Sequence, residues 1–189
     1  MKFLVLAALP LAMVATSVRA DFVPAMQAYL DGAIRTWAAD PVLVAAIEAA
    51  NAERAGYDQA MIDQLDTAWR AEVGQASTPT ISPVLQNAAS EFLRAQVAGS
   101  EGRITEVFVM DAHGLNVAAS DVTSDMWQGD EDKFTKTFGA GPDGVFFGDV
   151  ELDESTQTFS GQISISIVDP ETNEVIGALT VGVDAESLM

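Results

Sequence analysis

The hydrophobic pattern of the chain changes its period near residue 100, and this change most limits the folds open to it. Before that point, apolar residues recur at spacings of three and four, which indicates amphipathic helices. After it, they alternate with polar residues or form short β-branched runs, which indicates strands. The sequence therefore predicts an α+β fold, with N-terminal helices packed against a five-stranded, mainly antiparallel sheet.

Four helices are predicted within residues 21–99. Capping signals, in which a side-chain oxygen or a proline stands at the first turn, mark three of their starts: Asp40–Pro41, Asp58 and Ser82–Pro83. Five strands are predicted within residues 100–189, at 104–110, 115–120, 145–152, 157–169 and 175–184. A polar loop and a short helix are expected to join the second strand to the third.

The fourth predicted strand has two faces of different character. Alternation places three isoleucines on one face and three polar residues on the other: Ile163, Ile165 and Ile167 against Gln162, Ser164 and Ser166. The isoleucine face must be buried. The polar face either meets solvent or lines a polar pocket.

The N-terminus has the pattern of a secretory signal peptide. Lys2 precedes an apolar run, and a small-residue cleavage site ends at Ala20. The run is shorter than the ~20 residues that a spanning helix needs, although a retained anchor is the alternative. We expect cleavage near Ala20, which would leave a periplasmic or secreted protein that does not itself span the membrane.

The charge of the chain further limits the classes of function that it can have. The chain carries 28 acidic and 9 basic residues, and contacts to nucleic-acid phosphates need Lys and Arg, so no nucleic-acid partner is expected. Residues 101–189 hold 18 of the acids and only three basic residues, which indicates either a solubility surface or a field that attracts cations. There is no cysteine and only one histidine, His113. Because no catalytic motif is present either, we expect neither an enzyme nor a cofactor or metal site.

The order of elements resembles the Cache (PDC-type, PAS-like) extracytoplasmic sensor domain, in its single-domain form. Two segments carry the resemblance, "VFVMDAHGLNVAASDVTSDMWQGDEDKF" (107–134) and "GQISISIVDPETNEVIGALTVGVD" (161–184), and it covers most of 82–188. It implies a helical region at 21–99, a sensor domain at 100–189, and a small-molecule ligand between the sheet and residues 123–138. No arginine follows Trp127, where many Cache receptors grip a ligand carboxylate. A cationic or amine-containing ligand is therefore expected, unless Lys133 or backbone amides bind a carboxylate.

Several residues are candidates for binding that ligand. An indole face and neighbouring carboxylates can hold an ammonium group, which selects Trp127, Asp125 and Asp130. Alternatively, Trp127 packs against the core and Asp130 caps the next helix. Further candidates lie on the short helix and the later strands: Lys133, Phe134, Phe146, Gln162, Ser164 and Asp184. Asp184 could instead cap the last turn of the chain.

The resemblance implies that a membrane receptor or a sensor kinase receives the signal, since the chain ends five residues after Asp184. Two alternatives remain open. In the first, the fold serves only protein–protein contact through helices within 22–74, and the sheet face is packed shut without a polar cavity. In the second, calcium stabilises the domain through the acidic residues of the loop: Asp121, Asp125, Asp130, Glu131 and Asp132.

Overall fold

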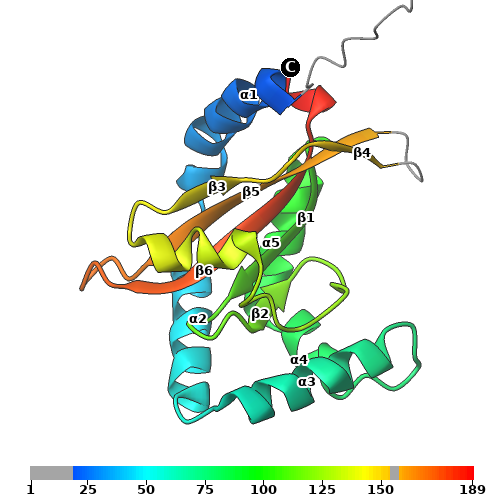
Figure 1. Cartoon of the computed structure of the whole chain (residues 1–189), viewed down its shortest axis with the longest axis vertical. Helices are drawn as coiled ribbons and strands as arrows, with labels where there is room; N and C mark the ends of the chain where they lie inside the picture. The colour runs from blue at the N-terminus through cyan, green and yellow to red at the C-terminus, as the bar shows by residue number, and fades with distance from the viewer. Residues whose placement is uncertain (1–18, 154–157) are drawn as a thin grey trace, which may run out of the picture.

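The computed structural model of the chain describes residues 19–153 and 158–189, so nearly all of the predicted signal segment 1–20 lies outside the described residues. The fold is α+β (Figure 1). The helices are α1 (Arg19–Gly32), α2 (Pro41–Arg54), α3 (Gln59–Glu72), α4 (Ile81–Leu85), α5 (Ala88–Gly99) and α6 (Asp132–Thr135). The strands are β1 (Ile104–Met110), β2 (Asn116–Ala119), β3 (Val145–Phe147), β4 (Glu151–Asp153), β5 (Thr158–Val168) and β6 (Val175–Asp184).

The strands form one antiparallel sheet in the order β2-β1-β6-β5-β3, and β4 also pairs with β5. The strand predicted at 145–152 is instead two short strands. Phe147 pairs with Ile163 whereas Glu151 pairs with Ser160, so the connection carries one residue more than the facing stretch of β5. An extra residue of this kind makes the chain bulge away from its partner strand.

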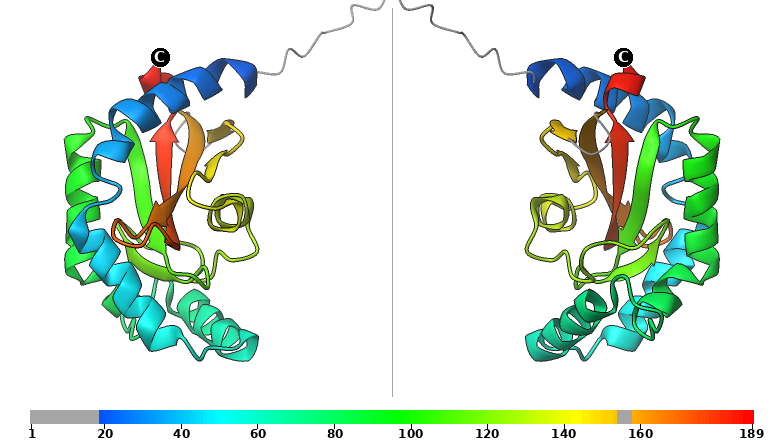
Figure 2. Two further views of the ribbon diagram at one scale, coloured as in Figure 1. Left: turned by 90° about the vertical axis from the view of Figure 1, so that its left-hand side faces the viewer. Right: turned by 90° about the vertical axis from the view of Figure 1, so that its right-hand side faces the viewer.

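Helices α1, α2 and α5 cover one face of the sheet (Figure 2). The isoleucine face of β5 is buried there, as predicted, together with apolar residues of β1 and β6. Helices and sheet thus share one core. Its fully buried side chains include Met26, Leu30, Ile34, Leu43, Ile47, Leu93, Ile163, Ile167 and Leu179.

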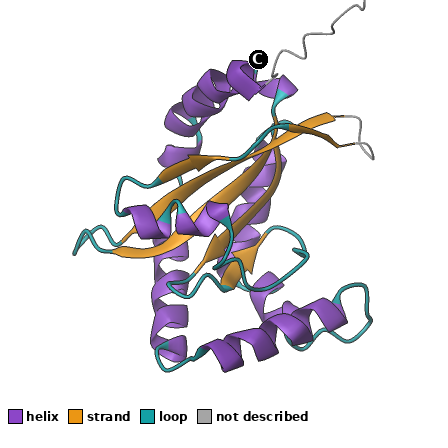
Figure 3. Cartoon of the chain, viewed as in Figure 1, coloured by secondary structure: helices purple, strands orange, loops and turns teal. Residues whose placement is uncertain are grey.

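The segment between β2 and β3, which includes α6, crosses the opposite face of the sheet, and it lies in front of the strands in Figure 3. A second apolar cluster fills the space beneath it and extends to α3 and α4. Phe108 and Met110 of β1 contribute to this cluster from the sheet, and Phe134 contributes from α6. This cluster covers only part of the face.

Helix starts follow the predicted capping residues at two places. The Asp40 carboxylate accepts a hydrogen bond from the Val42 amide (2.9 Å), and Asp58 does the same for Met61 (3.0 Å). The helix predicted to open at Ser82–Pro83 is instead two helices. Asn87 causes the break, because its side chain caps α5 through the Ser90 amide. Its Nδ2 also donates to the carbonyls of Pro83, Val84 and Val117.

A buried ion pair joins α2 to the turn between β1 and β2. Arg54 Nη1 lies 2.7 Å from Asp111 Oδ2, and the Asp111 side chain is fully buried. The other carboxylate oxygen of Asp111 accepts hydrogen bonds from the amides of His113 (2.8 Å) and Leu115 (3.0 Å). One carboxylate therefore both shapes the turn and fastens it to the helical layer.

Candidate functional site

A cavity of about 710 Å³ opens on the sheet face opposite the helical layer, next to the segment that α6 belongs to. Strands β1, β5 and β6 form its floor. Asp121 and Val122, which follow β2, supply one wall, and the bulged connection between β3 and β4 supplies another together with β4. The one-residue bulge therefore shapes the cavity that the sheet presents.

Three residues form a row across the floor. Glu106 of β1 pairs with Gly182 of β6, which in turn pairs with Gln162 of β5. A Cβ atom at Gly182 would lie 2.6 Å from Cγ of Glu106 and 2.8 Å from Oγ1 of Thr105. The glycine thus leaves the space in which the Glu106 side chain lies. Across it, the side chain of Gln162 is a hydrogen-bond partner of the Glu106 carboxyl group.

The Glu106 carboxyl group has an unusual electrostatic environment. Burial raises its pKa, and the neighbouring charge of Asp121 acts in the same direction. The ammonium group of Lys133 and the hydrogen bond with Gln162 oppose this, but the net pKa remains above the ordinary value. A carboxylate held this way lacks full compensation for its charge, which favours the approach of a cation.

The raised pKa predicts a pH-dependent gain in stability for Glu106→Gln. A raised pKa means that Glu106 binds its proton more tightly in the folded state than in the unfolded state. Proton binding at Glu106 therefore stabilises the fold, completely below the ordinary pKa of 4.5, and this stabilisation is lost as the pH rises through the folded-state pKa. Glutamine carries no charge at any pH. We therefore expect the variant to match the wild type near pH 4 and to be more stable near pH 8, as measured by urea unfolding.

The matched control is Glu174→Gln, which removes an exposed carboxylate from the β5–β6 hairpin. Because this carboxylate is exposed, we expect the free energy of unfolding of the control near pH 8 to stay close to that of the wild type. A constant stability difference between Glu106→Gln and the wild type across the same pH range would contradict a raised pKa at Glu106.

The walls of the cavity combine acidic and apolar groups. Asp121, Asp149 and Glu151 line it with Glu106, and no described lining residue is basic. Val122 and Leu152 also line it, with 40% and 48% of their surfaces exposed. Exposed aliphatic side chains beside carboxylates suit a ligand that has both an ammonium group and an alkyl part.

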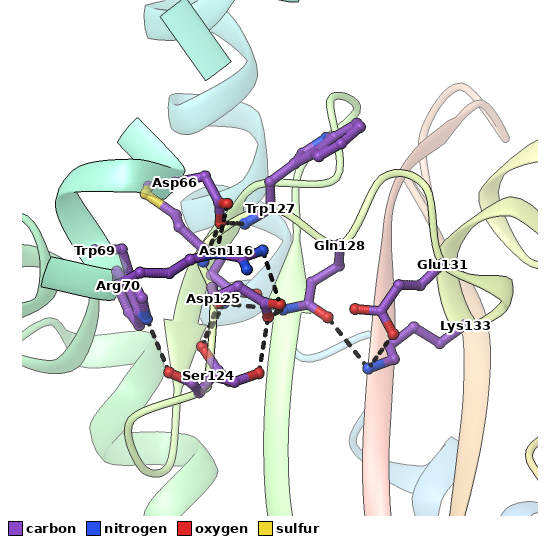
Figure 4. A network of polar contacts seen from close by, with 12 residues as sticks. Asp66, Trp69, Arg70, Asn116, Ser124, Asp125, Trp127, Gln128, Glu131 and Lys133 are labelled. Carbon is purple, nitrogen blue, oxygen red and sulfur yellow. Dashed lines mark hydrogen bonds and ion pairs between the residues drawn. The ribbon is translucent and has the colours of Figure 1, made fainter. Parts of the chain in front are cut away.

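Lys133 lies next to this floor. Its Nζ is 3.0 Å from Glu131 Oε2 and 3.2 Å from Gln128 Oε1, and Figure 4 shows both acceptors converging on the ammonium group. The same nitrogen lies 5.5 Å from the ring centroid of Phe108. Because Phe108 follows Glu106 by two residues, both side chains project from the same face of β1.

Of the residues predicted to bind ligand, Gln162 lines the cavity and Lys133 lies next to its floor. Three others are packed or bonded elsewhere on the same face. Ser164 is fully buried, and its hydroxyl group is hydrogen-bonded to that of Thr180 (3.0 Å). Phe134 stacks on Phe138, with 5.0 Å between the ring centroids. The ring centroid of Phe146 lies 4.8 Å from Nζ of Lys136.

Trp127 and Asp125 belong to the loop's own framework. The indole Nε1 of Trp127 donates to the His113 carbonyl (2.9 Å), and the ring packs with the second apolar cluster. Asp125 accepts a hydrogen bond from Gln128 Nε2 (2.5 Å) and lies 3.4 Å from Nη2 of Arg70. The structure thus does not bring these two residues to the cavity.

Asp130 and Asp184 do not line the cavity either. Asp130 is exposed, and the predicted cap is wrong by one residue, since Glu131 occupies the N-cap position of α6 without a side-chain bond. Helix α6 begins one residue later than predicted because the Glu131 amide still donates to the Gln128 carbonyl, in the turn that precedes the helix. Asp184 accepts the Glu186 amide (3.1 Å), so it caps the final turn.

Helix α3 holds the same loop from outside the sheet (Figure 4). Asp66 Oδ1 accepts hydrogen bonds from the backbone amides of Met126 (3.0 Å) and Trp127 (3.1 Å). The buried indole of Trp69 donates to the Thr123 carbonyl (2.8 Å). The loop is therefore bonded to a helix that precedes it by more than fifty residues.

The acidic residues proposed for calcium do not converge. Glu131 pairs with Lys133, and Asp132 pairs with Lys136 at 2.6 Å. Within residues 19–153 and 158–189, no group of three or more metal-binding side chains could hold an ion.

Two functional candidates, Glu106 and Gly182, were not selected from the sequence. The signal for Glu106 is a charged residue inside the mostly apolar run Ile104–Met110. Gly182 has a weaker signal, because a glycine near the end of a strand has many roles. Only the pairing of β1, β6 and β5 places the two beside Gln162.

Several solved structures that are similar to this chain are sensor or ligand-binding domains of histidine kinases and chemoreceptors. One is the sensor domain of the Vibrio cholerae histidine kinase DctB, with a TM-score of 0.49 and 15% identity over 88% of this chain and 53% of that one. Another is the Campylobacter jejuni chemoreceptor Tlp3 with isoleucine bound, with a TM-score of 0.40 and 14% identity over 88% and 65%. A third is the Pseudomonas aeruginosa amino-acid chemoreceptor PctC with GABA, with a TM-score of 0.41 and 12% identity over 66% and 52%.

At these identities the likeness is one of fold. The chain spans about half of the DctB and PctC domains that it matches. No protein-family model and no curated protein matches it. None of the helices described is long and apolar enough to cross a membrane.

Proposed function

We propose that this protein is a non-enzymatic, extracytoplasmic binding module of the Cache type. In this proposal it takes up a small organic cation in the cavity and reports the cation to a membrane receptor or sensor kinase. The observation that carries the proposal is the row of Glu106, Gly182 and Gln162 on the cavity floor, which presents a partly buried carboxylate to an acid-lined opening.

The chemistry of a primary amine fits this arrangement. An ammonium group has three donors, and a carboxylate in a partly buried site makes strong charge-assisted hydrogen bonds with them. Val122 and Leu152 offer apolar surface for an attached alkyl chain. Gln162 and Lys133, both predicted from the sequence, belong to the proposed site. Export through the segment ending at Ala20 is part of the proposal.

The alternative of a pure interaction module predicts a sheet face that is packed shut. The second apolar cluster does close part of this face, but the acid-lined cavity occupies the neighbouring part. Ligand binding therefore accounts for a feature that the alternative leaves without a role.

Three small molecules of one chain length test the proposal: butylamine, butanol and butyrate. A ligand that binds only the folded state stabilises it by ~2.7 kcal/mol at 100 times its dissociation constant. We expect butylamine, together with longer amines and quaternary ammonium ions, to raise the melting temperature. Butanol controls for apolar burial and butyrate for charge, and neither should have an effect. Stabilisation by butyrate without stabilisation by butylamine would contradict the proposed cation site.

A further inference from the structure

We propose that Lys133 sets the charge selectivity of the cavity. Its ammonium group is fixed beside the floor, where it competes with an incoming cation for the field of Glu106. The wild-type protein then binds organic cations less tightly than its acidic walls alone would allow. This inference rests on the proposed function, since it concerns the ligand of the same cavity.

The Lys133 side chain is held rather than free to swing away. Its Nζ contacts Glu131 and Gln128, and the side chain is only 15% exposed. Gln128 is itself buried, and its Nε2 donates to the carboxylate and the carbonyl of Asp125. Figure 4 shows this series of contacts running from the loop to the ammonium group. The positive charge is therefore built into the site.

The position of this charge links it to Glu106. Nζ lies over the Phe108 ring, on the sheet face from which Glu106 also projects. In agreement with this placement, the charge of Lys133 favours the ionised form of Glu106. Lys133 therefore has two opposite effects: it keeps Glu106 ionised, and it repels any second cation brought to Glu106.

The C-cap position of the helix that carries Lys133 provides a matched control. Lys136 lies one turn later, pairs with Asp132 at 2.6 Å, and has its Nζ 4.8 Å from the ring centroid of Phe146. It differs in being 55% exposed and in contacting no residue of the cavity floor among its described contacts. Lys133→Met and Lys136→Met thus remove the same charge, one from α6 and one from its C-cap position, each above a phenylalanine.

The experiment is calorimetric titration of butylamine into the two variants and the wild type at about pH 8, where Glu106 is more fully ionised. We expect Lys133→Met to bind butylamine about three- to tenfold more tightly, with a difference that shrinks at high salt. Lys136→Met should match the wild type. If the wild type binds butylamine and Lys133→Met binds it equally or more weakly, the role of Lys133 is overturned and the proposed function is not. Binding by none of the three proteins would overturn the proposed function and this inference together.

A second measurement needs no ligand. Carboxyl-carbon NMR titration reports the pKa of Glu106, which faces Lys133, Asp121 and Gln162. We expect the pKa to rise in Lys133→Met and to stay unchanged in Lys136→Met. A Glu106 pKa that stays at the wild-type value in Lys133→Met would overturn the proposal, because the ammonium group would then not act on the cavity floor.

Discussion

Glu106→Gln is expected to weaken the binding of butylamine by about 10- to 100-fold, because hydrogen bonds to a charged group contribute ~1.5–3 kcal/mol and 1.4 kcal/mol corresponds to a tenfold change. The substitution keeps the size of the side chain and its hydrogen-bonding capacity toward Gln162. It removes the one carboxylate on the floor whose charge is partly buried. Calorimetric titration at about pH 8 measures the loss directly.

Two kinds of control separate the role of Glu106 from the effect of overall charge. Glu174→Gln removes the same charge from an exposed hairpin and should bind like the wild type. Gly182→Ala keeps the carboxylate but forces it to move, because the new methyl group would lie 2.6 Å from Cγ of Glu106. Gly148→Ala adds the same methyl group to the same cavity at an ordinary 3.4 Å from Gln162.

We expect Gly182→Ala to lose affinity and Gly148→Ala to keep it. Equal affinities for these two variants, or wild-type affinity in Glu106→Gln, would show that the cation binds elsewhere.

Asp111→Ala is expected to lower the free energy of unfolding by about 3–5 kcal/mol, which is the usual cost of removing one partner from a buried ion pair. Arg54 would keep its charge with its carboxylate partner gone, and its side chain is only 13% exposed. The backbone amides of His113 and Leu115 would lose their acceptor at the same time. Urea unfolding monitored by circular dichroism measures the change.

Asp31→Ala is the surface counterpart of this substitution. It breaks an ion pair with Arg35 that is largely exposed, and such pairs contribute little to stability. We expect its free energy of unfolding to stay close to that of the wild type. If Asp111→Ala were no more destabilising than Asp31→Ala, the turn between β1 and β2 would not depend on the buried pair.

Local features of this fold could be predicted from the sequence. Asp40 and Asp58 cap their helices through amides two and three residues ahead, so the signal and its partner lie in one short stretch. The sheet could be predicted because its strands are apolar or alternating runs that are joined by hairpins. Asn87 was missed as a helix boundary although its cap bond to the Ser90 amide is equally short in range. The apolar spacing on either side of it, at Val84, Leu85, Ala88 and Ala89, continues without a break and so favours a single helix.

The site was harder to predict because its parts meet only across strands. Glu106, Gly182 and Gln162 are separated by long stretches of chain, and the register of three strands brings them into one row. Trp127 shows the opposite case. An aromatic residue in a loop suggested ligand contact, but the indole is bonded to the His113 carbonyl, and a sequence pattern gives no information about that acceptor.

The bonds from Asp66 and Trp69 to the loop bear on how the domain opens. The amides of Met126 and Trp127 find their acceptor on α3, so α3 cannot detach without leaving them unpaired. We therefore expect the helix and the loop to open together in local unfolding. In hydrogen exchange, protection of these two amides reports the attachment of α3, an element sixty residues earlier in the chain, rather than the integrity of the sheet.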